Sequence, residues 1–101
     1  MQENIELKDV DKIKLKTISA QKVVHMKDLI LKEAHIIIDN NLMVPRTKRV
    51  DETDRVSLII KVDDDFKHDI KDFCNAHSIR IRDFWVECVQ RIIKRDEKHD
   101  R

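Results

Sequence analysis

The fold of this chain is decided by the stretch Arg55-Val56-Ser57-Leu58-Ile59-Ile60-Lys61-Val62-Asp63. Every second residue from Val56 to Val62 is apolar, which places these side chains on one side of an extended strand. After Asp63 the period changes from two residues to about 3.6, as in a helix. The apolar residues of this first helical pattern are Phe66, Ile70, Phe73 and Cys74, and those of a second are Ile81, Phe84, Trp85, Cys88, Val89, Ile92 and Ile93. The sequence therefore predicts a mainly α fold with one short β-strand followed by two helices.

That order of elements resembles the ribbon-helix-helix family of DNA-binding proteins. The resemblance rests on the strand stretch above, on Phe73-Cys74-Asn75-Ala76, and on Ile81-Arg82-Asp83 at the start of the second helix. Within the family the chain looks closest to plasmid partition proteins of the ParG type, which carry the fold after an N-terminal tail. The resemblance implies an intertwined homodimer that binds double-stranded DNA sequence-specifically, with roles in plasmid or chromosome partition and autorepression.

Three positions depart from the family pattern. Ser78 stands at a turn where the family usually has glycine, and this chain has no glycine. Arg80 stands where the family usually has a Ser or Thr N-cap. Ile59 stands on the outer side of the strand, where the family usually has a polar residue. A non-glycine residue with positive φ is costly, so the turn at Ser78 is expected to be built differently.

A lone strand cannot pair its own backbone N–H and C=O groups, so we expect two copies to pair antiparallel across a two-fold axis. The helices would cover the inner face of this ribbon, with a dimer core of Leu58, Ile60, Val62, Ile70, Phe84, Trp85, Cys88 and Val89. A paired ribbon fits the major groove, where Ser57, Ile59 and Lys61 of each strand would face base edges. An alternative for Ile59 is packing against N-terminal residues.

Arginines at the ends of the predicted elements are candidate phosphate contacts. Arg55 precedes the strand, and Arg80 and Arg82 begin the second helix, whose free amides and positive dipole end attract anions. The alternative for the two helix residues is simple solvation. A further basic group, Arg46, Lys48 and Arg49, would contact flanking DNA or a partner protein.

The N-terminal half is expected to be an attachment to the DNA-binding unit. Residues 1–18 are predicted to be a flexible or partner-ordered tail, residues 19–43 an amphipathic helix capped by Ser19, and residues 44–54 a linker around Pro45. Residues 55–101 would form the ribbon-helix-helix domain, with Asp63 as N-cap of its first helix. The apolar face of residues 19–43 would pack in the dimer or dock another protein, and no internal repeat is visible. The resemblance implies a Walker-type ATPase as that partner.

Composition limits the remaining functions. The formal net charge is +1, so no overall basic field indicates a nucleic-acid partner. Neither a secretory signal nor a membrane-length apolar run is present, and two cysteines without pairing context favour a reducing cytoplasm. Cys74, His77, Cys88 and His99 could be read as a zinc site, but both cysteines are in phase with the core. We expect no metal, no cofactor and no enzymatic activity, since nothing resembles a nucleophile with its base or a phosphate loop.

Three alternatives remain open. An antitoxin-type repressor would use residues 1–43 to wrap a toxin, and a conjugation accessory protein would bind DNA in a similar way. The third alternative belongs to another class, a protein-interaction adaptor that does not bind DNA. In that adaptor, residues 5–18 would form strands that pair with residues 56–62 within a monomer.

Overall fold

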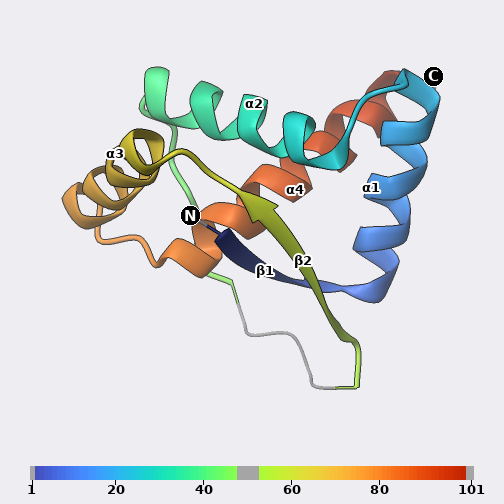
Figure 1. Cartoon of the computed structure of the whole chain (residues 1–101), viewed down its shortest axis with the longest axis horizontal. Helices are drawn as coiled ribbons and strands as arrows, with labels where there is room; N and C mark the ends of the chain where they lie inside the picture. The colour runs from blue at the N-terminus through green and yellow to red at the C-terminus, as the bar shows by residue number, and fades with distance from the viewer. Residues whose placement is uncertain (1, 48–52, 100–101) are drawn as a thin grey trace.

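The computed structural model describes residues 2–47 and 53–99. In these residues the chain is mostly helical, with one short antiparallel sheet of two strands (Figure 1). The elements in chain order are β1 (Gln2–Lys8), α1 (Asp9–Lys22), α2 (Met26–Asp39), β2 (Arg55–Lys61), α3 (Asp64–Ala76) and α4 (Ile81–His99). The strand and the two helices predicted after Arg55 are confirmed.

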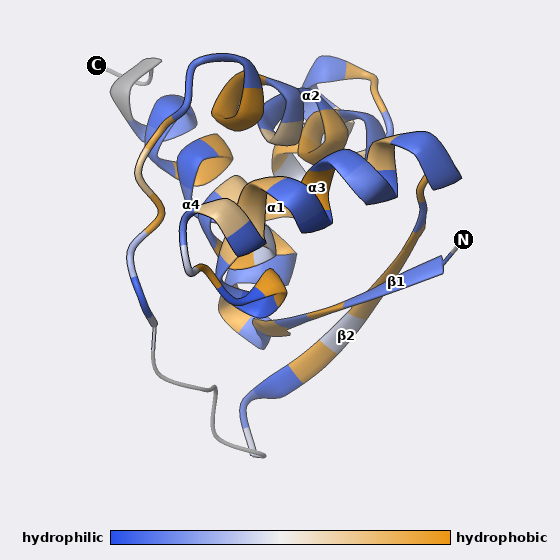
Figure 2. Cartoon of the chain, turned by 90° about the vertical axis from the view of Figure 1, so that its left-hand side faces the viewer, coloured by the Kyte–Doolittle hydropathy of each residue, from blue (hydrophilic) through white to orange (hydrophobic). Residues whose placement is uncertain are grey.

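The two strands form a ribbon that lies on one side of the helices (Figure 2). β1 pairs antiparallel with β2 along its whole length, from Gln2 opposite Lys61 to Lys8 opposite Arg55. Apolar side chains on the inner face are largely buried; Ile5 is 1% exposed and Ile60 is 3% exposed. The period-two pattern predicted for β2 is confirmed, and β1 follows the same alternation.

The N-terminal half is folded differently from the sequence-based prediction. The predicted tail, residues 1–18, is folded where the structure describes it, because residues 2–8 form a strand and a helix follows directly. The described residues therefore contain two strands where one was expected. The predicted helix over residues 19–43 is two helices, and Ser19 lies inside α1, where its Oγ donates to the Lys16 carbonyl at 2.9 Å. α1 ends because Val23 adopts a left-handed φ of 55°.

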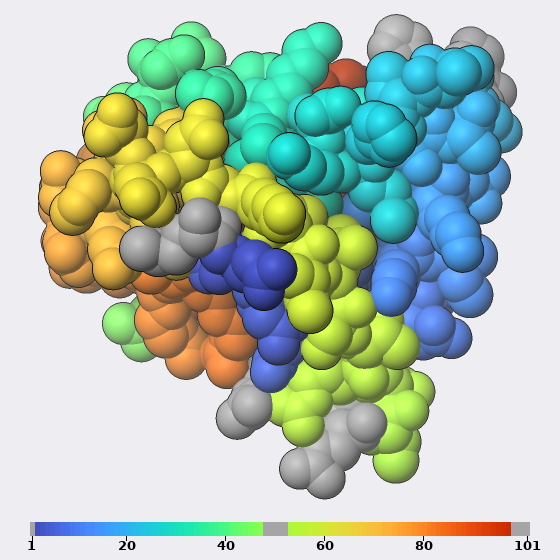
Figure 3. All heavy atoms as spheres, in the orientation of Figure 1, coloured from blue at the N-terminus to red at the C-terminus, as the bar shows by residue number. Residues whose placement is uncertain are grey.

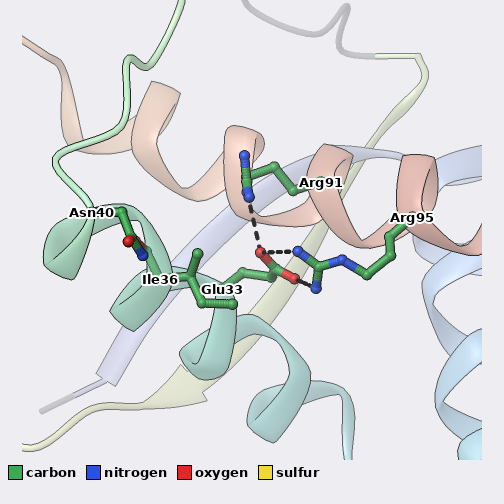
Figure 4. A network of polar contacts seen from close by, with 5 residues as sticks. All are labelled: Glu33, Ile36, Asn40, Arg91 and Arg95. Atoms are coloured by element: carbon green, nitrogen blue, oxygen red, sulfur yellow. Dashed lines mark hydrogen bonds and ion pairs between the residues drawn. The ribbon is translucent and has the colours of Figure 1, made fainter.

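Helices α2 and α4 pack against each other and form the centre of the core. The buried residues of α2 are Ile30, Glu33, Ala34 and Ile37. The carboxylate of Glu33 accepts hydrogen bonds from Arg91, at 3.2 Å, and from Arg95 on α4 (Figure 4). Ile30, Ala34 and Ile37 of the apolar face that was expected to need a dimer or a partner protein are buried within the chain, whereas Val23 and Val24 are exposed.

The chain contains an internal repeat, so the expectation of none was wrong. α1 begins at Asp9 and α3 at Asp64, 55 residues later, and α2 and α4 begin at Met26 and Ile81, also 55 residues apart. The left-handed residues Val23 and Ser78 have the same spacing. Identical pairs at this spacing include Asp9 and Asp64, Lys12 and Lys67, Lys16 and Lys71, and Asp28 and Asp83. The repeat is hard to see in the sequence because most pairs of equivalent positions have different residues and are alike only in whether the side chain is buried.

The turns between the helices show the repeat in their hydrogen bonds. The N–H of Val24 donates to the Ser19 carbonyl at 3.0 Å, and the N–H of Ile79 donates to the Cys74 carbonyl at 2.8 Å. Ser78 therefore takes the positive φ that the family gives to glycine, at a steric cost, so the expectation of a differently built turn was wrong.

The two βαα halves are related by an approximate two-fold exchange, which places α1 on α3, α2 on α4, and the reverse. The packing of α1 on α4 then corresponds to the packing of α3 on α2, and both contacts are present. Two lysines at equivalent positions of the halves show the same relation, because each contacts the strand of the other half. Lys12 donates to the Ser57 carbonyl of β2 at 3.0 Å, and Lys67 forms an ion pair with Glu3 of β1. One chain thus supplies both strands that the sequence reading assigned to two copies.

Candidate nucleic-acid interface

The outer face of the ribbon is open to solvent in the view of Figure 3, where β1 and β2 face the reader between α1 and α3. The outward residues are Gln2, Asn4, Glu6 and Lys8 of β1, and Arg55, Ser57, Ile59 and Lys61 of β2. Six of these are exposed, and Glu6 and Arg55 are partly buried. The face therefore carries amide, hydroxyl, ammonium and carboxylate groups and one exposed isoleucine.

All three positions predicted for base readout lie on this face. Ser57 and Lys61 are exposed, and the side chain of Ile59 is 61% exposed, so Ile59 is not buried against N-terminal residues. The strand register places Lys61 opposite Gln2, Ile59 opposite Asn4, and Ser57 opposite Glu6. β1 of the same chain thus stands where the prediction placed the strand of a second copy.

The three partners on β1 were missed by the sequence reading. A signal was present, since Ile5 and Leu7 alternate with Asn4, Glu6 and Lys8. The pattern spans few residues, however, and no turn signal links it to β2. Its chemistry suits base edges: Gln and Asn amides match adenine, and Glu accepts from the cytosine N4 amine.

Arg55 is placed at the ribbon end but is engaged with the protein. Its Nη1 lies 3.5 Å from the Glu6 Oε2, and both side chains are mostly buried. The nearby ammonium group of Lys12, on α1, is an additional cation beside the ribbon that the sequence reading did not assign. Lys12 and Lys8 are therefore candidates for the phosphate role expected of Arg55.

Arg80 and Arg82 differ in what they contact. Arg80 Nε donates to the Asp83 Oδ2 at 3.0 Å, and its Nη2 donates to the Thr47 carbonyl at 3.1 Å. Asp83 is 1% exposed and also accepts from the Thr47 hydroxyl at 2.7 Å. Arg80 therefore fastens the segment after α2 to the start of α4. A contact of Arg80 with a DNA phosphate would compete with its hydrogen bonds to Asp83 and Thr47.

Arg82 faces a pocket of about 280 Å³ between β1 and the first turn of α4. The pocket is lined by Asn4, Ile5, Glu6, Ile81, Arg82 and Trp85. Among the described residues, neither the Arg82 Nε nor the Trp85 Nε1 has a hydrogen-bond partner, although both atoms are buried. These donors stand at a helix N-terminus beside the ribbon, which suits a phosphate oxygen. Lys27 holds the equivalent position of the other repeat and is exposed.

The remaining predicted residues are placed as follows. Arg46 is exposed, whereas Lys48 and Arg49 lie outside the described residues. The predicted dimer core is buried within one chain, with Leu58 half-buried and the others at most 5% exposed. Asp63 stands at the N-cap of α3, but its side chain makes no capping hydrogen bond.

The cysteines are core residues in the structure. Burial raises the pKa of Cys74 to about 11, against a smaller opposite effect of Lys67, and burial also raises the pKa of Cys88. Both thiols are therefore protonated and unreactive at neutral pH. Across residues 2–47 and 53–99, no three His, Cys, Asp or Glu side chains gather in a way that could hold a metal ion.

Helix length and polarity bear on membrane insertion. Of the helices that the structure describes, none combines the length and apolar character needed to cross a bilayer. Comparisons of the chain with protein-family models, with curated proteins and with solved structures find no match.

Proposed function

We propose that this chain binds double-stranded DNA by inserting the β1–β2 ribbon into the major groove, in the manner of a ribbon-helix-helix protein. The observation that carries the proposal is the ribbon itself: its inner face is covered by helices, and its outer face presents polar groups to solvent. A two-stranded ribbon has the width of the major groove, where base edges are most distinct.

The chemistry of the outer face supports base recognition. Lys61 can donate to guanine, Asn4 can pair with the adenine edge, and Ile59 can contact a thymine methyl group. Phosphates would be held by Arg82 and Lys27 at the two equivalent helix starts, by Lys8 at one end of the ribbon, and by Lys12 beside Ser57. The resemblance to ParG-type proteins extends the proposal to DNA partition and autorepression.

The DNA-binding unit that we propose is a single chain. The expected homodimer followed from a strand without a neighbour, but β2 is fully paired with β1. Residues 1–43 were expected to bind a partner protein, because the resemblance implied an ATPase and the antitoxin alternative a toxin. Ile30, Ala34 and Ile37 of their apolar face are buried within the chain, so the burial of these residues needs no docked partner.

The test begins with selection of binding sites from a pool of random duplexes. The selected duplex and a random duplex are then titrated with the wild type and with Lys61→Ala. The variant should bind the selected duplex about 5- to 150-fold more weakly, which corresponds to about 1–3 kcal/mol for one good base contact. Its affinity for random DNA should change much less. Lys32→Ala is a matched control, because Lys32 is an exposed lysine on α2.

A contrary outcome would favour a second candidate, the protein-interaction adaptor. That alternative expected residues 5–18 to form strands that pair with residues 56–62 in a monomer. Gln2–Lys8 does pair with Arg55–Lys61, whereas residues 9–18 belong to α1. The formal net charge of +1 also suits it. If selection enriches no sequence and affinity for duplex DNA shows no salt dependence, the adaptor replaces DNA binding.

A further inference from the structure

We infer that the chain reads a non-palindromic DNA site, because the two ends of its ribbon are equivalent in position but different in chemistry. The inference rests on the proposed DNA binding and specifies it further. Homodimeric DNA-binding proteins present the same side chains twice and therefore match palindromic sites. This chain presents each outward position once.

The centre of the ribbon is the pair Ile5 opposite Leu58. A two-fold exchange through this centre maps β1 onto β2 with a shift of 53 residues, as from Ile5 to Leu58. The helices repeat at 55 residues because two residues, Val62 and Asp63, stand between β2 and α3, whereas α1 follows β1 directly. The exchange of the strands relates Gln2 to Arg55, Asn4 to Ser57, Glu6 to Ile59, and Lys8 to Lys61. Of these four relations, only the last joins residues of the same type.

Each end of the ribbon combines residues of both strands. The first end presents Gln2, Asn4, Ile59 and Lys61, and the second end presents Glu6, Lys8, Arg55 and Ser57. The first end has two amides, one apolar side chain and one ammonium group, all of them exposed. These groups can select adenine, thymine and guanine.

The second end is chemically different because an ion pair occupies it. Glu6 and Arg55 lie within 3.5 Å of each other, and the exchange relates them to Ile59 and Gln2, which cannot form such a pair. Base contacts by Glu6 or Arg55 would compete with this ion pair. Lys8 and Ser57 remain exposed at this end. We therefore expect most of the DNA sequence specificity in the half-site that contacts the first end.

The experiment uses the full chain and a selection of binding sites from random duplexes, repeated with two variants. Asn4→Ala and Ser57→Ala change exposed residues at equivalent positions of the two ends, so each is the control for the other. We expect a non-palindromic consensus for the wild type. Asn4→Ala should relax base preference in one half-site alone and weaken binding to the consensus about 5- to 150-fold. Ser57→Ala should weaken it less than about 3-fold and leave that half-site unchanged.

Two synthetic palindromes complete the test. A palindrome of the informative half should bind no more tightly than the selected site, and a palindrome of the other half should bind at least about 10-fold more weakly. A palindromic consensus, or equal relaxation of both halves by Asn4→Ala and Ser57→Ala, overturns this inference while leaving DNA binding in place. Absence of any enriched sequence overturns DNA binding, and the inference with it.

Discussion

Buried carboxylates link elements that are distant in the chain. Glu33 is 2% exposed and is held by Arg91 and Arg95 of α4, and Asp83 is held by Arg80 and Thr47. A buried charge needs such partners, because removal from water is expensive otherwise. Sequence periodicity predicts an apolar face, but it does not show which residues form ion pairs or hydrogen bonds with an acid on that face.

Replacing Glu33 by Gln tests the link between α2 and α4. The amide keeps the shape of the side chain but loses the charge that accepts from both arginines. We expect the free energy of unfolding to fall by about 2–3 kcal/mol in urea titrations. Glu97→Gln is the matched control: Glu97 is 63% exposed, lies 3.8 Å from Lys14, and should cost less than about 0.5 kcal/mol. An equal effect of the two variants would contradict the structural role of Glu33.

Asp83 gives a prediction about pH. Burial by itself raises the pKa of this carboxyl. Hydrogen bonds from Thr47 and Arg80 lower the pKa by more than burial raises it, so the pKa lies below its ordinary value. A depressed folded-state pKa contributes stability that is present above the pKa of the unfolded chain, about 4. That stability is lost as the pH falls from about 4 through the folded-state pKa.

The measurement compares urea unfolding of the wild type and Asp83→Asn across this range of pH. The variant should be less stable at pH 7, and the difference between the two proteins should shrink below about pH 4. Asp28→Asn changes the equivalent, exposed acid of the other repeat and should show no such trend. A difference for Asp83→Asn that is constant with pH would refute the prediction.

At the scale of elements, β1 completes the ribbon and closes the core. Ile5 on its inner face is 1% exposed, and Asn4, the neighbouring residue, is exposed on the outer face. Ile5→Ala should lower the free energy of unfolding by about 2–5 kcal/mol. Asn4→Ala should change it by less than about 0.5 kcal/mol, since surface substitutions are usually small in effect.

Urea unfolding of the two variants checks this prediction. If β1 were a mobile tail, both substitutions would be neutral. Removal of residues 1–43 should abolish the fold, because it takes away one strand of the ribbon and the helix that packs on α4.

For the whole molecule, the prediction concerns assembly. Because both strands and both helix pairs come from one chain, we expect a solution mass close to the 12.1 kDa of a single chain. Trp85 is 2% exposed without a second copy, so its burial does not require a dimer. Sedimentation at micromolar concentration, with and without DNA, measures this mass. A stable mass of two chains in the free protein would contradict the single-chain unit.

The sequence by itself determined the local structure after Arg55. The period of two in β2 and the periods near 3.6 in α3 and α4 are set by neighbouring residues, so the elements and their buried faces could be predicted. The outward placement of Ser57, Ile59 and Lys61 followed from the same alternation.

Only the tertiary structure decided which strand pairs with β2. Alternation shows which face of a strand is buried, but it carries no information about the neighbour, and the centres of the two strands are 53 residues apart at Ile5 and Leu58. The same applies to Arg80, whose partner Thr47 is distant in sequence. Because strand pairing and buried polar contacts depend on long-range contacts, the chain's own second strand replaced the expected second copy.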